Sequence, residues 1–219
     1  MSAGARSRAA RAAARTRRLL RRERELWGAG ARRIAGVDEA GVGPLAGPVV
    51  AAAVVFEPEF RLRGVDDSKV VKPERREELA FEIRESAVAW SVVAVEPEEI
   101  DRLNIYRASL EAMRRAVEGL GVRPDHVLVD ARTIPGIDLP QEGIVKGDRH
   151  SHAIAAASIL AKTDRDARMR GYEAKFPGYG FADHKGYPTE EHRHAIRRLG
   201  PCSIHRRSFT LLPHPRLFD

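Results

Sequence analysis

Four acidic residues follow short apolar segments of the kind that form buried β-strands. Asp38 and Glu39 come directly after the first such segment, Asp130 ends another, and Asp148 stands shortly after a third. Strand ends at one edge of a sheet lie close together in space, however far apart they are in the chain. We therefore expect the four carboxylates to gather at one place.

Carboxylates that gather in this way repel one another, and burial raises their pKa values further. Such a cluster is costly unless cations neutralise it, and carboxylate oxygens suit Mg²⁺ and Mn²⁺. Two such ions about 4 Å apart can activate a water and stabilise the leaving oxygen of a phosphoryl displacement. For any one acid the alternative is a helix cap or an ion pair with a lysine. The metal hypothesis depends on all four following apolar segments.

The elements expected to position these acids follow an α/β pattern. Strands are predicted over 33–37, 49–56, 87–95, 126–129 and 144–145, and helices over 74–85, 98–120, 151–170 and 190–199. An antiparallel opening followed by strand–helix alternation predicts a mixed central β-sheet flanked by helices, with a helical C-terminal part. We expect one catalytic domain over 33–212, a flexible extension over 1–32 and a tail over 213–219.

The net charge of +7 is a property of the N-terminal extension. Residues 1–33 hold eleven arginines and two glutamates, a charge of +9, and the rest of the chain sums to −2. Such a segment could hold phosphates without sequence preference, or have no function. No apolar run reaches the roughly 18 residues of a membrane span. The single Cys202 excludes an internal disulfide and predicts a reducing, cytoplasmic setting.

Several motifs resemble those of one family. The segment from Gly36 to Ala51 closely resembles the opening motif of ribonuclease HII, the type 2 ribonucleases H. Further resemblances follow in the family's order: Asp67–Lys69, Asp130, Lys146–Asp148, Ala155–Asp166, His184–Tyr187 and His205–Phe209. The resemblance implies an RNase H-like fold and cleavage of the RNA strand of RNA–DNA hybrids and of single ribonucleotides embedded in duplex DNA. It also implies attack 5′ to the ribonucleotide, leaving 3′-hydroxyl and 5′-phosphate ends.

The same resemblance implies roles for individual residues. Asp38, Glu39, Asp130 and Asp148 would be the catalytic residues and would hold two Mg²⁺ or Mn²⁺ ions when substrate is bound. Tyr187 would stack on the sugar at the RNA–DNA junction.

The turn formed by Gly41, Val42 and Gly43 would place backbone N–H groups near the 2′-hydroxyl, which distinguishes RNA from DNA. Val42 stands where the family usually has a basic residue, and this leaves substrate preference less determined than reaction type. Hydroxyl and cationic side chains near the motifs are candidate phosphate contacts, each with a solvated surface group as its alternative. They are Ser68, Lys69, Lys146, Ser158 and Lys162.

Three other functions remain as alternatives. A type III ribonuclease H would need a folded N-terminal domain, for which 33 Arg- and Ala-rich residues are too few. A DNA resolvase or transposase-like enzyme would have no use for the Gly41–Gly43 turn. A non-catalytic duplex-binding module would bind phosphates better without the four carboxylates.

Two further predictions concern residues outside the cluster. We interpret Asp166 as a structural residue paired within its helix, and His192 and His194 as part of an exposed helix face. The C-terminal Leu217 and Phe218 faintly resemble tails that dock on sliding clamps. We expect a monomer without a membrane partner.

Overall fold

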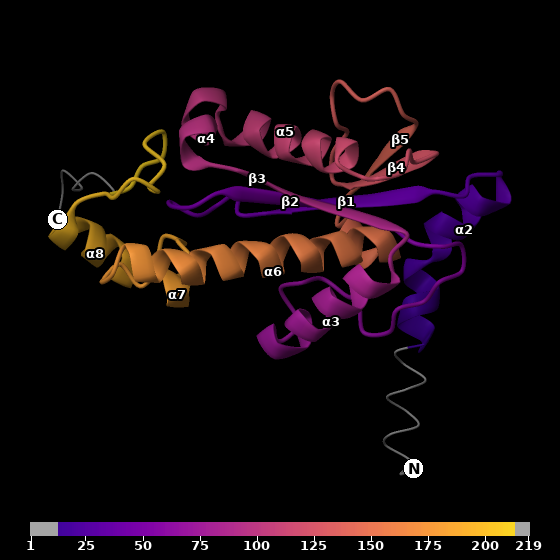
Figure 1. Ribbon diagram of the computed structural model, residues 1–219, viewed down its shortest axis with the longest axis horizontal. Helices are drawn as coiled ribbons and strands as arrows, with labels where there is room; N and C mark the ends of the chain where they lie inside the picture. Colours follow the sequence, from indigo (N-terminus) through magenta and orange to yellow (C-terminus); the bar gives the residue numbers. More distant parts are fainter. Residues whose placement is uncertain (1–12, 213–219) are drawn as a thin grey trace, which may run out of the picture.

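A five-stranded β-sheet forms the centre of the protein, and the computed structural model describes residues 13–212. The strand order is β3-β2-β1-β4-β5; β2 is antiparallel to both β1 and β3, and β4 is parallel to both β1 and β5. The strands are β1 Ile34–Ala40, β2 Val49–Val55, β3 Ala89–Val95, β4 His126–Asp130 and β5 Gln141–Ile144. This mixed sheet confirms the predicted fold class (Figure 1).

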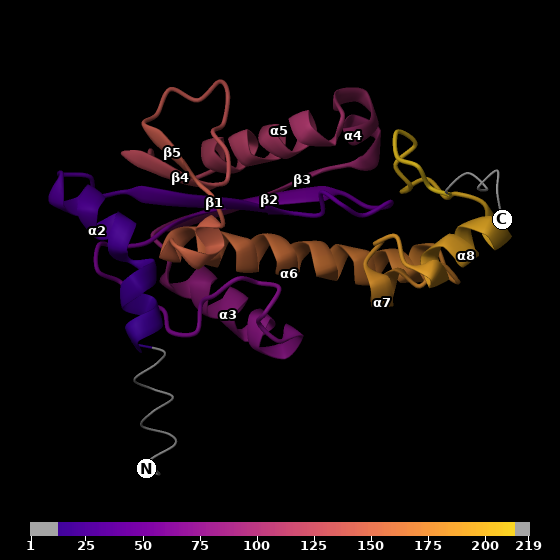
Figure 2. The same ribbon diagram turned by 180° about the vertical axis from the view of Figure 1, so that it is seen from behind.

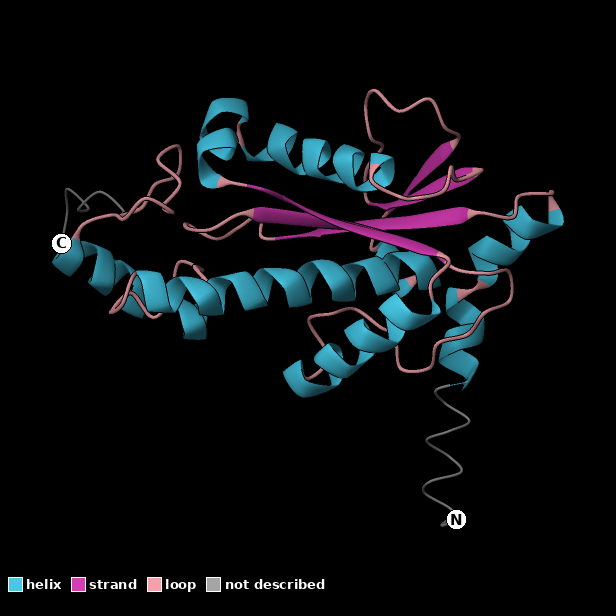
Figure 3. Cartoon of the chain, in the orientation of Figure 1, coloured by secondary structure: helices cyan, strands magenta, loops and turns pink. Residues whose placement is uncertain are grey.

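Helices cover both faces of the sheet, with α4 and α5 on one face and α3 and α6 on the other (Figure 3). Successive side chains of a strand point to opposite faces. In β2, Val49 and Ala51 accordingly belong to the apolar core under α5, and Val50 and Ala52 to the core under α6. The helices are α2 Arg21–Gly28, α3 Pro73–Ser86, α4 Pro97–Leu103, α5 Ile105–Glu118, α6 His152–Lys175, α7 Phe181–His184 and α8 Glu190–Leu199, with a 3-10 helix η1 at Gly147–Arg149.

Close packing of β1 on α6 depends on a glycine. A side chain at Gly36 would overlap the backbone of Ala153 in the first turn of α6. Ser151 caps this helix, because its hydroxyl accepts a hydrogen bond from the Ile154 N–H at 3.2 Å. The helix extends to Lys175, beyond its predicted end, and carries residues of the functional site along its length.

Residues 98–120 are mostly helical, as predicted, but the chain forms two helices there instead of one. Asn104 separates α4 from α5 with a φ of +68°, which a continuing right-handed helix cannot contain. Its side chain accepts a hydrogen bond from the Arg107 N–H at 3.1 Å and so caps α5. Ile100 and Met113 are both fully buried, so the apolar stripe runs across the break.

Part of the basic N-terminal segment packs against the sheet domain, which differs from the flexible extension that its composition predicts. Residues 13–19 are helical and α2 follows (Figure 2). The buried Glu23 carboxylate accepts hydrogen bonds from the Ser151 hydroxyl (2.7 Å) and the Ala153 N–H (3.1 Å) at the start of α6. A helix N-terminus favours a negative charge, so this glutamate ties α2 to α6. Residues 1–12 lie outside the described residues.

The chain ends in a smaller helical part that includes α7 and α8, as predicted. A separate apolar cluster joins it to the last turns of α6, through Met169, Phe181 and Ile204. Among residues 13–212, no helix is both long and apolar enough to cross a lipid bilayer. The tail with Leu217 and Phe218 lies outside the described residues.

Candidate active site

All four predicted carboxylates line one cavity of about 220 Å³. The cavity walls come from the end of β1 and the turn after it, the loop before α3, the end of β4, η1, α6 and the segment after α7. The lining residues are Asp38, Glu39, Ala40, Gly41, Val42, Gly43, Ser68, Lys69, Asp130, Asp148, Ser158, Lys162 and Tyr187. Lys146 is the one predicted site residue that does not line it, since it is exposed just before η1.

Strand register explains why the acids meet. Strand β1 continues to Ala40, so Asp38 and Glu39 lie inside it rather than after it. They project to opposite faces, because Asp38 pairs with a β2 residue of the α6 side and Glu39 with one of the α5 side. Asp130 ends β4, which is parallel to β1 with Val129 opposite Val37. Its Oδ1 accepts a hydrogen bond from the Gly147 N–H at 2.6 Å, which ties β4 to η1.

Burial and mutual repulsion disfavour the charged forms of these acids. Burial, followed by the charges of Glu39 and Asp130, raises the pKa of Asp38 well above its usual range. Burial also raises the pKa of Glu39, although the Arg132 guanidinium opposes this. Burial and neighbouring carboxylates raise the pKa of Asp148 to about 6. The cluster is therefore one that added positive charge would stabilise.

The donor set fits hard divalent cations. Carboxylate oxygens are their preferred ligands, and Glu39 Oε2 is buried without a hydrogen-bond partner in the described part of the chain. Within residues 13–212, no group of three or more His, Cys, Asp or Glu side chains is arranged to hold a metal ion by itself. The arrangement fits ions held by one or two carboxylates each, with water and substrate oxygens completing the coordination, as is usual for Mg²⁺.

Hydroxyl and ammonium groups line the α6 side of the cavity. The Ser158 hydroxyl donates a hydrogen bond to the Ser68 hydroxyl at 2.9 Å. The Lys162 ammonium pairs with Asp166 at 2.6 Å, which confirms a helical ion pair for this aspartate. Lys162 also lies 5.9 Å from the centre of the Tyr187 ring. The phosphate-binding roles of these groups stay predictions.

Two buried arginines hold the turn after β1 by its carbonyl groups. Arg206 donates hydrogen bonds to the carbonyls of Gly41 (2.6 Å) and Val42 (3.1 Å), and Arg165 donates to two further carbonyls near the turn. A trans peptide points its N–H away from its C=O. The N–H groups of Val42 and Gly43 therefore point away from Arg206. Gly41 has a φ of +99°, and a side chain there would overlap Arg165.

A chain of hydrogen bonds through two histidines fixes the backbone that carries Tyr187. The Cys202 N–H donates to Nδ1 of His205 at 2.9 Å, so His205 carries its own proton on Nε2. That proton is donated to Nε2 of His192 at 3.1 Å, and Nδ1 of His192 donates to the Tyr187 carbonyl at 2.9 Å. The prediction that His192 and His194 share an exposed helix face is wrong for His192, which is fully buried.

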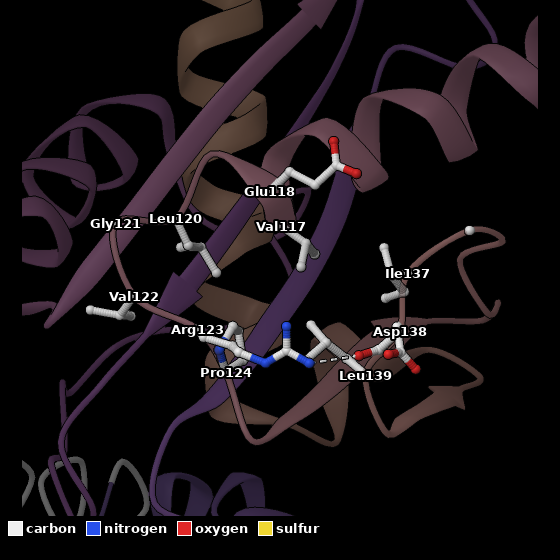
Figure 4. Close-up of a pocket in the computed structure, with 11 residues that line it drawn as sticks. Val117, Glu118, Leu120, Gly121, Val122, Arg123, Pro124, Ile137, Asp138 and Leu139 are labelled. Atoms are coloured by element: carbon white, nitrogen blue, oxygen red, sulfur yellow. Dashed lines mark hydrogen bonds between the residues drawn. The ribbon is translucent and has the colours of Figure 1, made fainter.

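A second cavity, of about 360 Å³, lies at the C-terminal end of α5 (Figure 4). Its walls are polar and apolar in about equal parts, and include Val117, Leu120 and Asp138. Arg123 spans one side and donates a hydrogen bond to the Asp138 carbonyl at 3.0 Å. None of the predicted site residues lines this cavity.

Comparison with known proteins identifies the family of this chain. The family model described as Ribonuclease HII matches residues 35–212, which include every predicted site residue. The chain belongs to the ribonuclease HII family. It is therefore an enzyme of the ribonuclease H class, a hydrolase.

Similar proteins come from bacteria and archaea. The ribonuclease HII of Myxococcus xanthus (strain DK1622) is 61% identical over 196 residues, which cover 89% of this chain and 67% of that protein. The crystal structure of the ribonuclease H2 from Pyrococcus horikoshii OT3 has a TM-score of 0.70 at 27% identity, covering 82% of this chain and 94% of that one. The RNase HII in the PCNA:RNase HII complex from Archaeoglobus fulgidus has a TM-score of 0.65 at 30% identity, covering 80% and 92%.

Proposed function

We propose that this protein is a metal-dependent endoribonuclease that cuts the RNA strand of RNA–DNA hybrids and single ribonucleotides embedded in duplex DNA. Hydrolysis on the 5′ side of the ribonucleotide would leave 3′-hydroxyl and 5′-phosphate ends. The observation that carries the proposal is one cavity lined by four carboxylates, a turn with outward N–H groups and an aromatic ring. The enzyme would act in the cytoplasm, where Cys202 stays reduced.

The carboxylates of Asp38, Glu39, Asp130 and Asp148 would hold two Mg²⁺ or Mn²⁺ ions together with substrate oxygens. When bound, such ions supply an activated water and stabilise the leaving oxygen of an in-line displacement. Cations bind the ionised form of a carboxylate, so their binding would lower the raised pKa values of Asp38 and Asp148.

Discrimination between ribose and deoxyribose would come from the other wall of the cavity. The N–H groups of Val42 and Gly43 point away from Arg206 and are free to donate to a 2′-hydroxyl, which deoxyribose lacks. Tyr187 is 40% exposed and would pack its ring on the sugar at the junction. Ser68, Lys69, Ser158 and Lys162 would contact the phosphates on either side, and the exposed Lys146 a more distant one.

The test is cleavage of a DNA duplex that contains one ribonucleotide. The full chain is incubated with this duplex in Mg²⁺, in Mn²⁺ and in excess chelator, and an all-DNA duplex of the same sequence serves as the control. We expect a single cut on the 5′ side of the ribonucleotide that depends on added metal. Cleavage in chelator, or equal cleavage of the all-DNA duplex, would refute the proposal.

A sliding clamp is a second proposed partner. It rests on the C-terminal Leu217 and Phe218, two apolar residues that could occupy a groove, and on the archaeal relative named above that forms a complex with PCNA. Deletion of both residues should abolish binding to a clamp in a pull-down with purified proteins while leaving cleavage of the short duplex unchanged. An intact interaction after deletion would exclude this tail as the docking segment.

A further inference from the structure

An exposed tyrosine stands beside the carboxylate cavity with an arginine stacked on it. Tyr106 lies in the first turn of α5 and is 57% exposed. The Arg132 guanidinium carbon lies 5.0 Å from the centre of its ring. Arg132 follows Asp130 by two residues, a span of at most about 7 Å. The charge of Arg132 also acts on Glu39 of the carboxylate cluster, which places the guanidinium near the cavity.

Polar contacts hold the Arg132 side chain and the backbone of Tyr106 in place. Arg132 donates a hydrogen bond from one guanidinium nitrogen to the Ser109 hydroxyl at 2.8 Å. Ser109 is fully buried and donates to the Tyr106 carbonyl at 2.9 Å. Asn104 caps the same turn of the helix. The Arg132 side chain is thus anchored to the helical turn that carries Tyr106, so binding a ligand there would order few additional bonds of the arginine.

The guanidinium of Arg132 has no acidic partner among the described residues and so is available to a ligand. Among the described residues it forms no ion pair within 4.0 Å, whereas Arg114 and Arg115 on the same helix α5 pair with glutamates. The positive charge of Arg132 acts on Glu39. Burial raises the pKa of this glutamate, and Arg132 lowers it. A half-buried guanidinium with free donors and a flat aromatic neighbour is suited to a phosphate and the sugar next to it.

We propose that Tyr106 and Arg132 form a binding site for the sugar–phosphate backbone of the bound duplex, next to the cleavage position. The ring packs on a sugar and the guanidinium pairs with the adjoining phosphate. This inference rests on the proposed function, because it takes the ligand of the carboxylate cavity to be a nucleic-acid duplex. It adds two residues that none of the motifs noted in the sequence contains.

The test measures binding apart from cleavage. Fluorescence anisotropy with the full chain in excess chelator gives the affinity for a labelled duplex with one ribonucleotide. Tyr106→Ala should weaken binding about 5- to 10-fold, within the range of an aromatic stacking contact. Arg132→Gln should lower the slope of log affinity against log salt by about 1, as expected for one lost phosphate contact. Arg132→Lys should restore the slope but only part of the affinity.

A similar pair elsewhere supplies the matched control. Arg84 lies 5.3 Å from the ring of Trp90, which is 41% exposed on β3, away from the cavity. Trp90→Ala and Arg84→Gln should leave affinity and salt slope unchanged. Thermal melts of all variants verify that each is folded.

Replacing single phosphates with neutral methylphosphonates, on either strand, identifies the strand that is bound. The wild type should lose affinity at one position, and Arg132→Gln should be insensitive to that same replacement. If the wild type cleaves the duplex but the Tyr106 and Arg132 variants bind like the controls, the inference is wrong and the proposed function stands. If the wild type neither binds nor cleaves it, both are wrong.

Discussion

Neutralising one carboxylate should stabilise the metal-free protein. The pKa of Asp148 is raised from an ordinary 3.8 to about 6 by burial and by neighbouring acids. Between these two values the folded state binds more protons than the unfolded state, so the free energy of unfolding falls as pH rises through this window. Above pH 6 the full penalty is present. The side-chain amide of the variant Asp148→Asn cannot ionise and should escape it.

The size of the effect follows from the shift. About two pKa units correspond to roughly 3 kcal/mol, and screening by water at this partly solvated site reduces that to about 1–2 kcal/mol. For a chain of this length, Asp148→Asn should raise the Tm by roughly 3–6 °C at pH 8 in chelator. At pH 4 the gain should nearly vanish, because Asp148 is then largely protonated in the folded wild type.

Thermal unfolding followed by circular dichroism at both pH values measures this difference. Asp138→Asn removes an exposed carboxylate outside the cavity and is the matched control. Adding Mg²⁺ should raise the Tm of the wild type more than that of Asp148→Asn, because bound cations relieve the same repulsion. A variant that is no more stable than the wild type at pH 8, or equally stabilised at pH 4, would refute the argument that these acids repel one another.

Four further changes test the proposed site. Asp130→Asn should reduce turnover by about 10³-fold or more, since several kcal/mol of charge stabilisation are lost, while duplex binding measured by anisotropy is retained. Tyr187→Ala should slow cleavage at a single ribonucleotide about tenfold and affect a long hybrid less; an equal loss on both substrates would contradict a junction role. Arg206→Gln should destabilise the protein by about 2–4 kcal/mol in urea unfolding and reduce the preference for ribose over deoxyribose in competition binding. Unaltered preference would mean that the turn does not read the sugar. Deleting residues 1–12, with three arginines, should lower the salt slope of duplex binding by up to about 3; an identical slope would show that this segment does not touch the duplex.

The sheet and the meeting of the acids could be predicted because they depend on local sequence. An apolar run over 49–56 is long enough for one strand buried on both faces, and acids that follow apolar runs lie at or near the ends of strands. Ser151 and Thr189 are helix caps whose side-chain chemistry acts within three residues. Such features need no knowledge of distant neighbours.

The features that were missed depend on distant neighbours. Nothing local distinguishes the buried His192 from an exposed helical histidine, because its partner His205 arrives from another part of the chain. Glu23 lies in an arginine-rich segment, and only its bonds to the start of α6 fix that segment in place. The helix break at Asn104 was missed because the helical spacing of apolar residues continues across it. The ligand roles of the four acids remain predictions, since no spacing rule states how many bind one ion.

The buried guanidinium of Arg206 fixes the Gly41–Gly43 turn to the folded interior by hydrogen bonds. Arg206 donates hydrogen bonds to the carbonyls of Gly41 and Val42. The direction of the N–H groups in the same peptides therefore depends on a buried side chain outside the turn. A substitution that shifts the backbone of this turn would therefore break hydrogen bonds of the buried Arg206 and lower stability. The side chain at position 42 is partly exposed, and a valine there would leave the direction of the N–H groups unchanged while offering no charge to the proposed substrate.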